Sequence, residues 1–88
     1  MSEFNATVTD IRLESQSSGV ARWRVSLDET GFGVGDKGEL VAVARSGARL
    51  VVPVLGIEVD DAGEMWHVVE KPLMTGTVVQ GRVETVVR

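Results

Sequence analysis

Two arginines flanking a tryptophan, Arg22-Trp23-Arg24, form the triplet in this sequence that is best suited to binding another molecule. Because side chains alternate between the two faces of a strand, the arginines share one face and Trp23 takes the other. Paired guanidinium groups contact phosphates, and an aromatic ring beside them stacks on a base. The same alternation also fits a structural interpretation, in which Trp23 lies in the core and both arginines are solvated. The alternation favours this structural interpretation.

Arg45 and Arg49 extend this candidate site, because they flank a turn signal, Ser46-Gly47. If the hairpins come together, these two residues and Arg82 join Arg22 and Arg24 in one basic patch. We therefore predict that RNA, a ribonucleoprotein or a protein partner binds a face near Arg22, Arg24, Arg45 and Arg49.

His67 is the single histidine, and the chain has no cysteine, so a metal site would need His67 together with carboxylates. The spacing fits no recognised ligand motif, and no serine has a base nearby in sequence. Asp60-Asp61 and Asp28-Glu29 lie beside glycine-containing turns and are expected to be solvated turn acids. We predict a non-enzymatic protein with no catalytic residue, metal or cofactor; an enzyme with a carboxylate-based site is the alternative.

Length and charge narrow the possibilities further. The 88 residues suffice for one hydrophobic core, so residues 1–88 are predicted to form a single domain. The net charge of −4 works against general attraction to a phosphate backbone. The absence of cysteine and of any apolar run long enough for a membrane span predicts a cytoplasmic protein without membrane insertion.

The hydrophobic pattern predicts an all-β fold, because apolar residues alternate or cluster in short segments and no helical stripe is present. The six expected strands cover residues 4–13, 21–27, 39–44, 49–59, 65–70 and 77–87. A change of parity around Asp10 predicts a bulge, and Pro53 predicts an edge position or a bulge. Trp23 and Trp66 are expected to anchor the core. The architecture expected is a small six-stranded antiparallel β-barrel, closed or nearly closed.

The order of several short motifs resembles domain II of translational GTPases such as elongation factor Tu. The motifs are Asp10-Ile11, Gly19, Arg24-Val25, Val34-Gly35-Asp36, Glu39-Leu40-Val41, Gly56-Ile57-Glu58 and Ala62-Gly63-Glu64, and the strand Gly76–Glu84 is similar to another strand of that family. The resemblance implies a barrel that contacts RNA, the ribosome or a neighbouring domain. It also implies that Glu58 matches a glutamate near the aminoacyl-tRNA end. The chain has no Gly-x-x-x-x-Gly-Lys-Ser/Thr loop, so nucleotide hydrolysis is not expected.

A second resemblance covers Gly35 to Pro53, which is similar to the OB-like barrel of NfeD-type proteins. The leading functional hypothesis is thus a binding module in a translation-related context, using Arg22, Arg24, Arg45, Arg49 and Glu58. The competing hypothesis is a structural or assembly protein that forms a homo-oligomer through a barrel edge or face.

Overall fold

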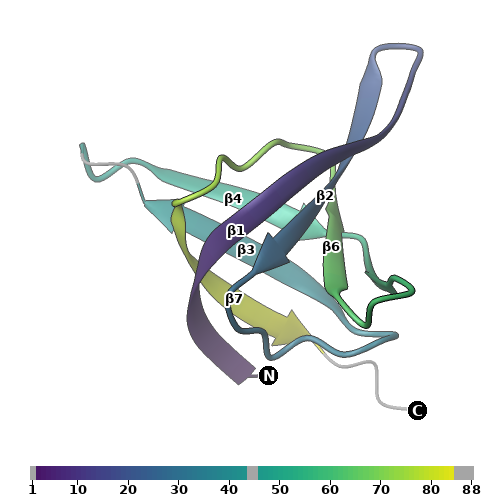
Figure 1. The fold of residues 1–88 in the computed structure, drawn as a ribbon. Helices are drawn as coiled ribbons and strands as arrows, with labels where there is room; N and C mark the ends of the chain where they lie inside the picture. Colours follow the sequence, from purple (N-terminus) through teal and green to yellow (C-terminus); the bar gives the residue numbers. More distant parts are fainter. Residues whose placement is uncertain (1, 44–45, 85–88) are drawn as a thin grey trace.

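A computed structural model describes residues 2–43 and 46–84, and it consists of strands and connecting loops (Figure 1). In chain order the strands are β1 (Ser2–Ser17), β2 (Val20–Leu27), β3 (Lys37–Val43), β4 (Arg49–Val54), β5 (Gly56–Val59), β6 (Met65–Val69) and β7 (Val78–Glu84). The prediction of an all-β fold is confirmed. Within the described ranges there is no helix with the length and hydropathy needed to cross a membrane.

The strands form one antiparallel sheet in the order β4-β3-β7-β1-β2-β6-β5. β1 connects the two halves, because its residues 2–7 pair with β7 whereas residues 8–17 pair with β2. A register shift between Val8 and Asp10 lies at the junction and confirms the predicted bulge. Because a bulge bends its strand and increases the twist, the two halves of the sheet turn toward each other around a shared core.

The two edge strands, β4 and β5, are consecutive in the chain and are joined by Leu55 alone. Leu55 donates its backbone N–H to the carbonyl of Val68. At this residue the chain stops pairing with β3 and begins to pair with β6. Although β4 and β5 are consecutive, no ladder of backbone hydrogen bonds pairs them in the part of the chain that the structure describes. The predicted strand 49–59 is two strands, and the six-stranded closed barrel is not confirmed. Pro53 does lie in an edge strand, as expected.

The connection between β1 and β2 is a two-residue turn, because Ser17 pairs with Val20. Ser18 and Gly19 have positive φ angles of 51° and 80°, as a type I′ turn requires. The hairpin extends beyond the sheet, since β6 pairs with β2 only from Trp23 to Val25. We call residues 12–22, which project at the upper right of Figure 1, the arm.

Aliphatic side chains from both halves of the sheet fill the space between them. The most completely buried are Val8, Val25, Leu40, Val52, Val69 and Val79. On β7, Val79 and Val83 are buried while Gln80 and Arg82 are half-buried, as the predicted alternation requires. Loop 28–36 covers the lower end of the rolled sheet in Figure 1, and segment 70–77 crosses the upper end.

Candidate functional site

The outer face of β6 carries Trp66, whose indole is covered by two arginines. Arg12 on β1 and Arg24 on β2 place their guanidinium carbons 4.7 Å and 5.5 Å from the centre of the Trp66 ring. Cation–π attraction and the apolar stems of the arginines act together here, and Trp66 is only 2% exposed. Trp66 is not part of the central core, whereas Trp23 packs against it. Trp66 is buried as expected, but it lies beneath the arginines on the outer face of β6 and not in the central cluster.

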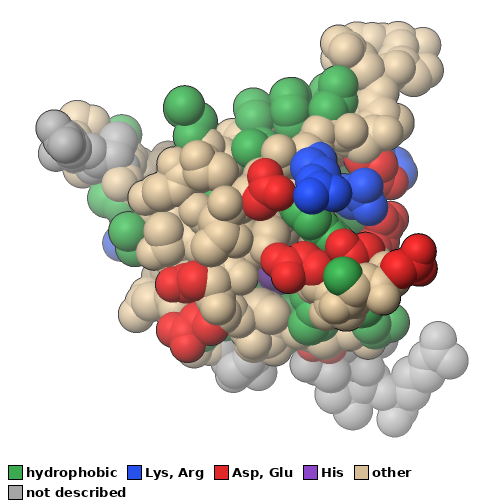
Figure 2. Space-filling view, in the orientation of Figure 1, with side chains coloured by type: hydrophobic (Ala, Val, Ile, Leu, Met, Phe, Trp, Pro, Cys, Tyr) green, Lys and Arg blue, Asp and Glu red, His purple; other side chains and the backbone are tan. Residues whose placement is uncertain are grey.

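Carboxylates accompany these arginines, as the red side chains beside the blue ones in Figure 2 show. Asp10 lies 3.5 Å from Arg12, and Glu58 lies 3.7 Å from Arg24. We call this surface, formed by Arg12, Arg24, Glu58 and Trp66, the arginine face. Its positive charge is locally compensated, which weakens its attraction for phosphate.

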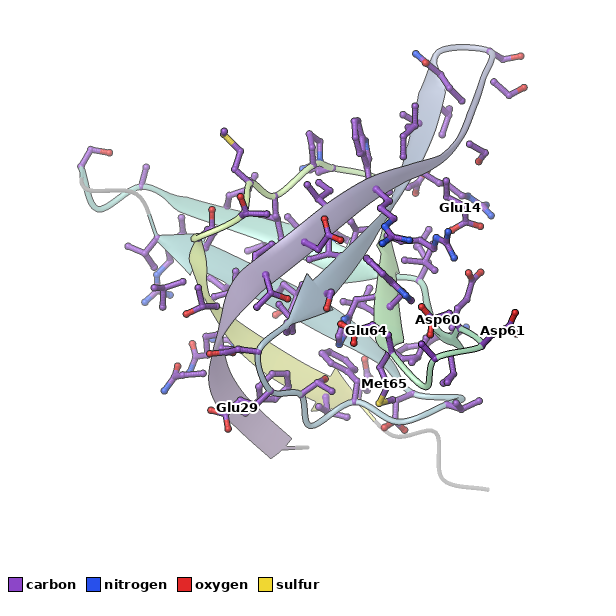
Figure 3. All side chains as sticks on the ribbon, viewed as in Figure 1. Glu14, Glu29, Asp60, Asp61, Glu64 and Met65 are labelled. Carbon is purple, nitrogen blue, oxygen red and sulfur yellow. The ribbon has the colours of Figure 1, made fainter. Side chains whose placement is uncertain are left out.

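Asp60 holds the turn that follows β5 and supports the arginine face. Its carboxylate accepts a hydrogen bond from the Trp66 indole N–H at 3.0 Å and from the backbone N–H groups of Ala62 and Glu64. The bond from Trp66, then those from the backbone, lower the pKa of Asp60 below its ordinary 3.8. In Figure 3, Asp61 points away from Asp60 and Glu64. The residues that the structure describes contain no cluster of three histidine or acidic side chains able to hold a metal ion.

The predicted site residues are only partly brought together. Arg22 and Glu58 line one shallow depression beside β5, and Arg24 forms an ion pair with Glu58. Arg49 begins β4. In the strand order, β3, β7 and β1 lie between β4 and β2. Arg45 lies outside the described residues.

His67 is fully buried on the opposite face of β6 from Trp66. Its Nδ1 lies 2.8 Å from the Val25 carbonyl oxygen, to which it can only donate, and its Nε2 lies 2.8 Å from the Thr30 hydroxyl. Because Nδ1 carries the proton, Nε2 of the neutral ring accepts from Thr30. Burial lowers the pKa of His67 below 6.5, although the bond to Val25 opposes this shift. The expected structural or surface role is thus a structural role in the core.

Thr30 belongs to loop 28–36, which plugs the lower end of the sheet with Phe32. The Phe32 ring is buried and packs edge-to-face on His67, with ring centres 5.3 Å apart, and on Phe4 at 5.6 Å. Asp28 and Asp36 accept hydrogen bonds from the backbone N–H groups of Thr7 and Gly33. We call this the plugged end. Asp28, Thr30 and Asp36 thus bind within the chain.

The opposite end of the sheet, the apolar end, contains a groove of about 310 Å³ between the β3–β4 hairpin and segment 70–77. The groove is lined by Ala42, Val43, Ala48, Arg49, Leu50, Pro72, Leu73, Met74 and Thr77. Met74 is 78% exposed and Leu50 is 41% exposed, so two large apolar side chains stand in solvent at its margin. Arg49 is the single charged residue of the lining.

Further apolar side chains adjoin this groove. Val51 and Val78 are exposed on the outer faces of β4 and β7, and Val43, which lines the groove, is exposed on β3 between them. Figure 2 shows hydrophobic side chains along the upper border of the molecule, from segment 70–77 toward the base of the arm. The apolar surface is therefore broader than the groove itself.

Sequence reasoning missed the apolar end, because it singled out neither Leu50 nor Met74. The one available signal was Arg49–Val59, which is apolar on both faces and cannot bury both in a half-exposed sheet. No family model matches the chain, and a search of curated proteins finds no match either.

Proposed function

We propose that this chain is a non-enzymatic binding module that docks a protein partner on its apolar end. The groove beside Leu50 and Met74 carries the proposal, because contiguous exposed apolar surface at this scale marks interaction sites. Methionine suits such a surface, since its unbranched side chain adapts to different partners. A non-enzymatic role agrees with His67, whose two nitrogens are both engaged inside the core.

The charge distribution supports protein over RNA as the partner. Arg12, Arg24 and Arg82 each lie within 4 Å of a carboxylate, so a phosphate would have to displace an acid that is already in place. The net charge of −4 adds a repulsive background for a nucleic acid. The resemblance to translation-factor domain II supports a partner in a translation-related assembly.

Site-specific photo-crosslinking tests the proposal. A benzophenone amino acid at position 74 is expected to form a covalent adduct with a protein in cells, because this side chain stands at the groove. The matched control places the same group at position 34, which is 75% exposed on the plugged end. Leu50→Ser in the same chain is expected to remove the adduct formed from position 74.

Equal adduct yields from positions 74 and 34, or none from either, would contradict docking at the apolar end. A titration with single-stranded RNA at low salt tests the competing partner. Binding that weakens steeply with salt and is lost in the Arg22→Ala/Arg24→Ala variant would assign the function to the arginine face instead.

A further inference from the structure

β4 is an edge strand, and the hydrogen-bonding groups on its outer side are free. It pairs with β3, and no other strand pairs with it in the described residues. Pro53, opposite Glu39, has no N–H to donate, so it occupies a position whose N–H would point away from β3. Because these groups alternate along a strand, Arg49 and Val51 also direct their N–H and C=O groups outward. Neither makes a backbone–backbone hydrogen bond outside the sheet ladders within the described part of the chain.

The free part of this edge lies at the beginning of β4. Val54 at the end of the strand is buried, and the next residue, Leu55, donates its N–H to Val68. Val51, by contrast, is 43% exposed, and the groove of the apolar end opens beside Arg49. An exposed strand edge with apolar side chains is a template for pairing with another chain. The beginning of β4 therefore combines free backbone groups with an apolar groove.

The side chains of β4 present different chemistry on the two faces of this edge. Leu50 lies on the same face as the buried Val52 and lines the groove with Met74. Arg49 and Val51 take the opposite face by alternation. A strand added beside β4 alternates in the same way, so its side chains pair directly with those of β4. The residue beside Leu50 is expected to be apolar and the residue beside Arg49 acidic.

Arg49 favours an acidic segment over a second copy of β4 as the added strand. It is the single charged residue that lines the groove, and it takes part in none of the ion pairs found among the described residues. An opposite charge directly across a strand pair is stabilising, and a like charge is destabilising. β4 itself, Arg49–Val54, contains no acid. A second β4 would therefore leave Arg49 without an acid opposite it.

We infer that the partner docks as an added β-strand on β4, through an extended segment of alternating apolar residues with an acid opposite Arg49. This inference rests on the proposed function, since the surface is the same, and it specifies the chemistry of the partner. Main-chain hydrogen bonds to Arg49 and Val51 supply affinity, and the groove and the arginine select the side chains. Only alternate backbone groups are bonded, which distinguishes this mode from a helix lying in the groove.

A phage-displayed library of random peptides, selected against the whole chain, tests the inference. The enriched peptides are expected to alternate apolar residues and to include an acidic one. Leu50→Ser is expected to raise the Kd of a selected peptide about tenfold or more, because it removes an apolar contact from the groove. Val34→Ser, on the plugged end, is the control and should leave the Kd unchanged.

A charge exchange tests the role of Arg49. Arg49→Glu is expected to weaken a selected peptide about tenfold. Replacing the acidic residue of that peptide by lysine is expected to restore binding to this variant, because the pair is rebuilt with opposite sign. Arg22→Glu changes the net charge by the same amount on the arm, away from β4, and should have a smaller effect on the Kd of the original peptide.

Amide hydrogen exchange, followed by NMR, gives the sharper measurement. A bound peptide is expected to slow exchange at Arg49 and Val51, whose N–H groups point outward, and to change Leu50 and Val52 less, because their N–H groups point toward β3. Val51→Pro removes one outward donor without removing a donor to β3, so it is expected to raise the Kd about tenfold. Thermal unfolding of each variant shows whether the fold is retained.

A bound peptide that does not slow exchange alternately along β4, or that binds a folded Val51→Pro variant equally well, would overturn the inference. So would a library that yields no binder, or a dimer of the chain that Val51→Pro abolishes, since the edge would then belong to a second copy. If one of these is found while position 74 still forms its adduct, strand addition is wrong and docking at the apolar end stands. If that adduct is absent too, both are wrong.

Discussion

The plugged end and the apolar end of the rolled sheet are each covered by one loop, and each loop buries one large side chain, Phe32 or Leu73, but the two loops differ in how their other residues are held. Loop 28–36 turns Phe32 inward and binds its polar groups to the chain through Thr30 and His67. Segment 70–77 buries Leu73, whereas its last residues are held by backbone hydrogen bonds between Gly76 or Thr77 and Val8, and Met74 stays outside.

This difference predicts that the plugged end contributes chiefly to folding stability and the apolar end chiefly to binding. A side chain that is removed from water within the chain contributes to the free energy of unfolding. An equally apolar side chain left in solvent contributes little to that free energy and is available to a partner. The four predictions below test this separation, beginning with the largest expected effect.

Phe32→Ala is expected to lower the free energy of unfolding by about 3–5 kcal/mol, because it empties the space between Phe4 and His67. Urea unfolding at neutral pH measures the change. Val34→Ala, two residues further along the same loop and exposed, is the control and should change stability by less than about 0.5 kcal/mol. Similar losses in both variants would show that the loop does not plug the sheet.

Gly38→Ala is expected to cost about 1–3 kcal/mol by overpacking. A Cβ at position 38 would overlap the backbone carbonyl oxygen of Arg82 and would lie 3.0 Å from the Phe32 ring, so β7 or the plug has to shift. Gly56→Ala is the matched control, because its Cβ would meet no atom within 4 Å. If Gly38→Ala left the free energy of unfolding unchanged, β3 and β7 would be packed less closely at this point than the structure shows.

His67 is expected to make stability fall as the pH drops below 6.5. Its pKa is lowered in the folded state, so the unfolded chain takes up a proton that the native core does not. The slope approaches about 1.4 kcal/mol per pH unit until the folded-state pKa is reached. Asp60, whose pKa is lowered from 3.8, adds its own loss only in more acidic solution.

Urea unfolding at a series of pH values from neutral to about pH 5 measures the His67 contribution. His67→Gln removes the titrating group and is expected to flatten the curve in this range. An unchanged slope in that variant would assign the dependence to other groups.

Met74→Ser is expected to change the free energy of unfolding by less than about 0.5 kcal/mol, since the side chain is exposed. The same substitution should weaken docking of the protein partner at the apolar end, measured as a lower adduct yield from a benzophenone amino acid at position 50. A stability loss as large as that of Phe32→Ala would erase the distinction between the two ends.

Much of the fold was predictable because alternation is a local property. Ala21, Trp23 and Val25 alternate with Arg22 and Arg24, and this pattern placed the tryptophan inward and Arg22 outward as observed. The bulge near Asp10 was predictable too, because a change of parity is visible in the sequence. The number of strands was not, since the break at Leu55 depends on its hydrogen bond to Val68, thirteen residues away.

The candidate site was less predictable. Arg22, Arg24 and Glu58 do meet, but the acid that accompanies each arginine depends on which strands are neighbours. Trp66 and His67 show the same limit. Alternation sends them to opposite faces, yet only the packing of Arg12 and Arg24 buries the tryptophan on the outside.

The sequence by itself determined that this chain forms antiparallel strands, where most of them turn, and which side chains face inward, because these follow from the period of the strand and from turn chemistry. The tertiary structure alone decided that the sheet stays open between β4 and β5, that the arm projects beyond the sheet, and that Leu50 and Met74 remain in water. These features depend on contacts between segments far apart in the chain, which no local pattern encodes.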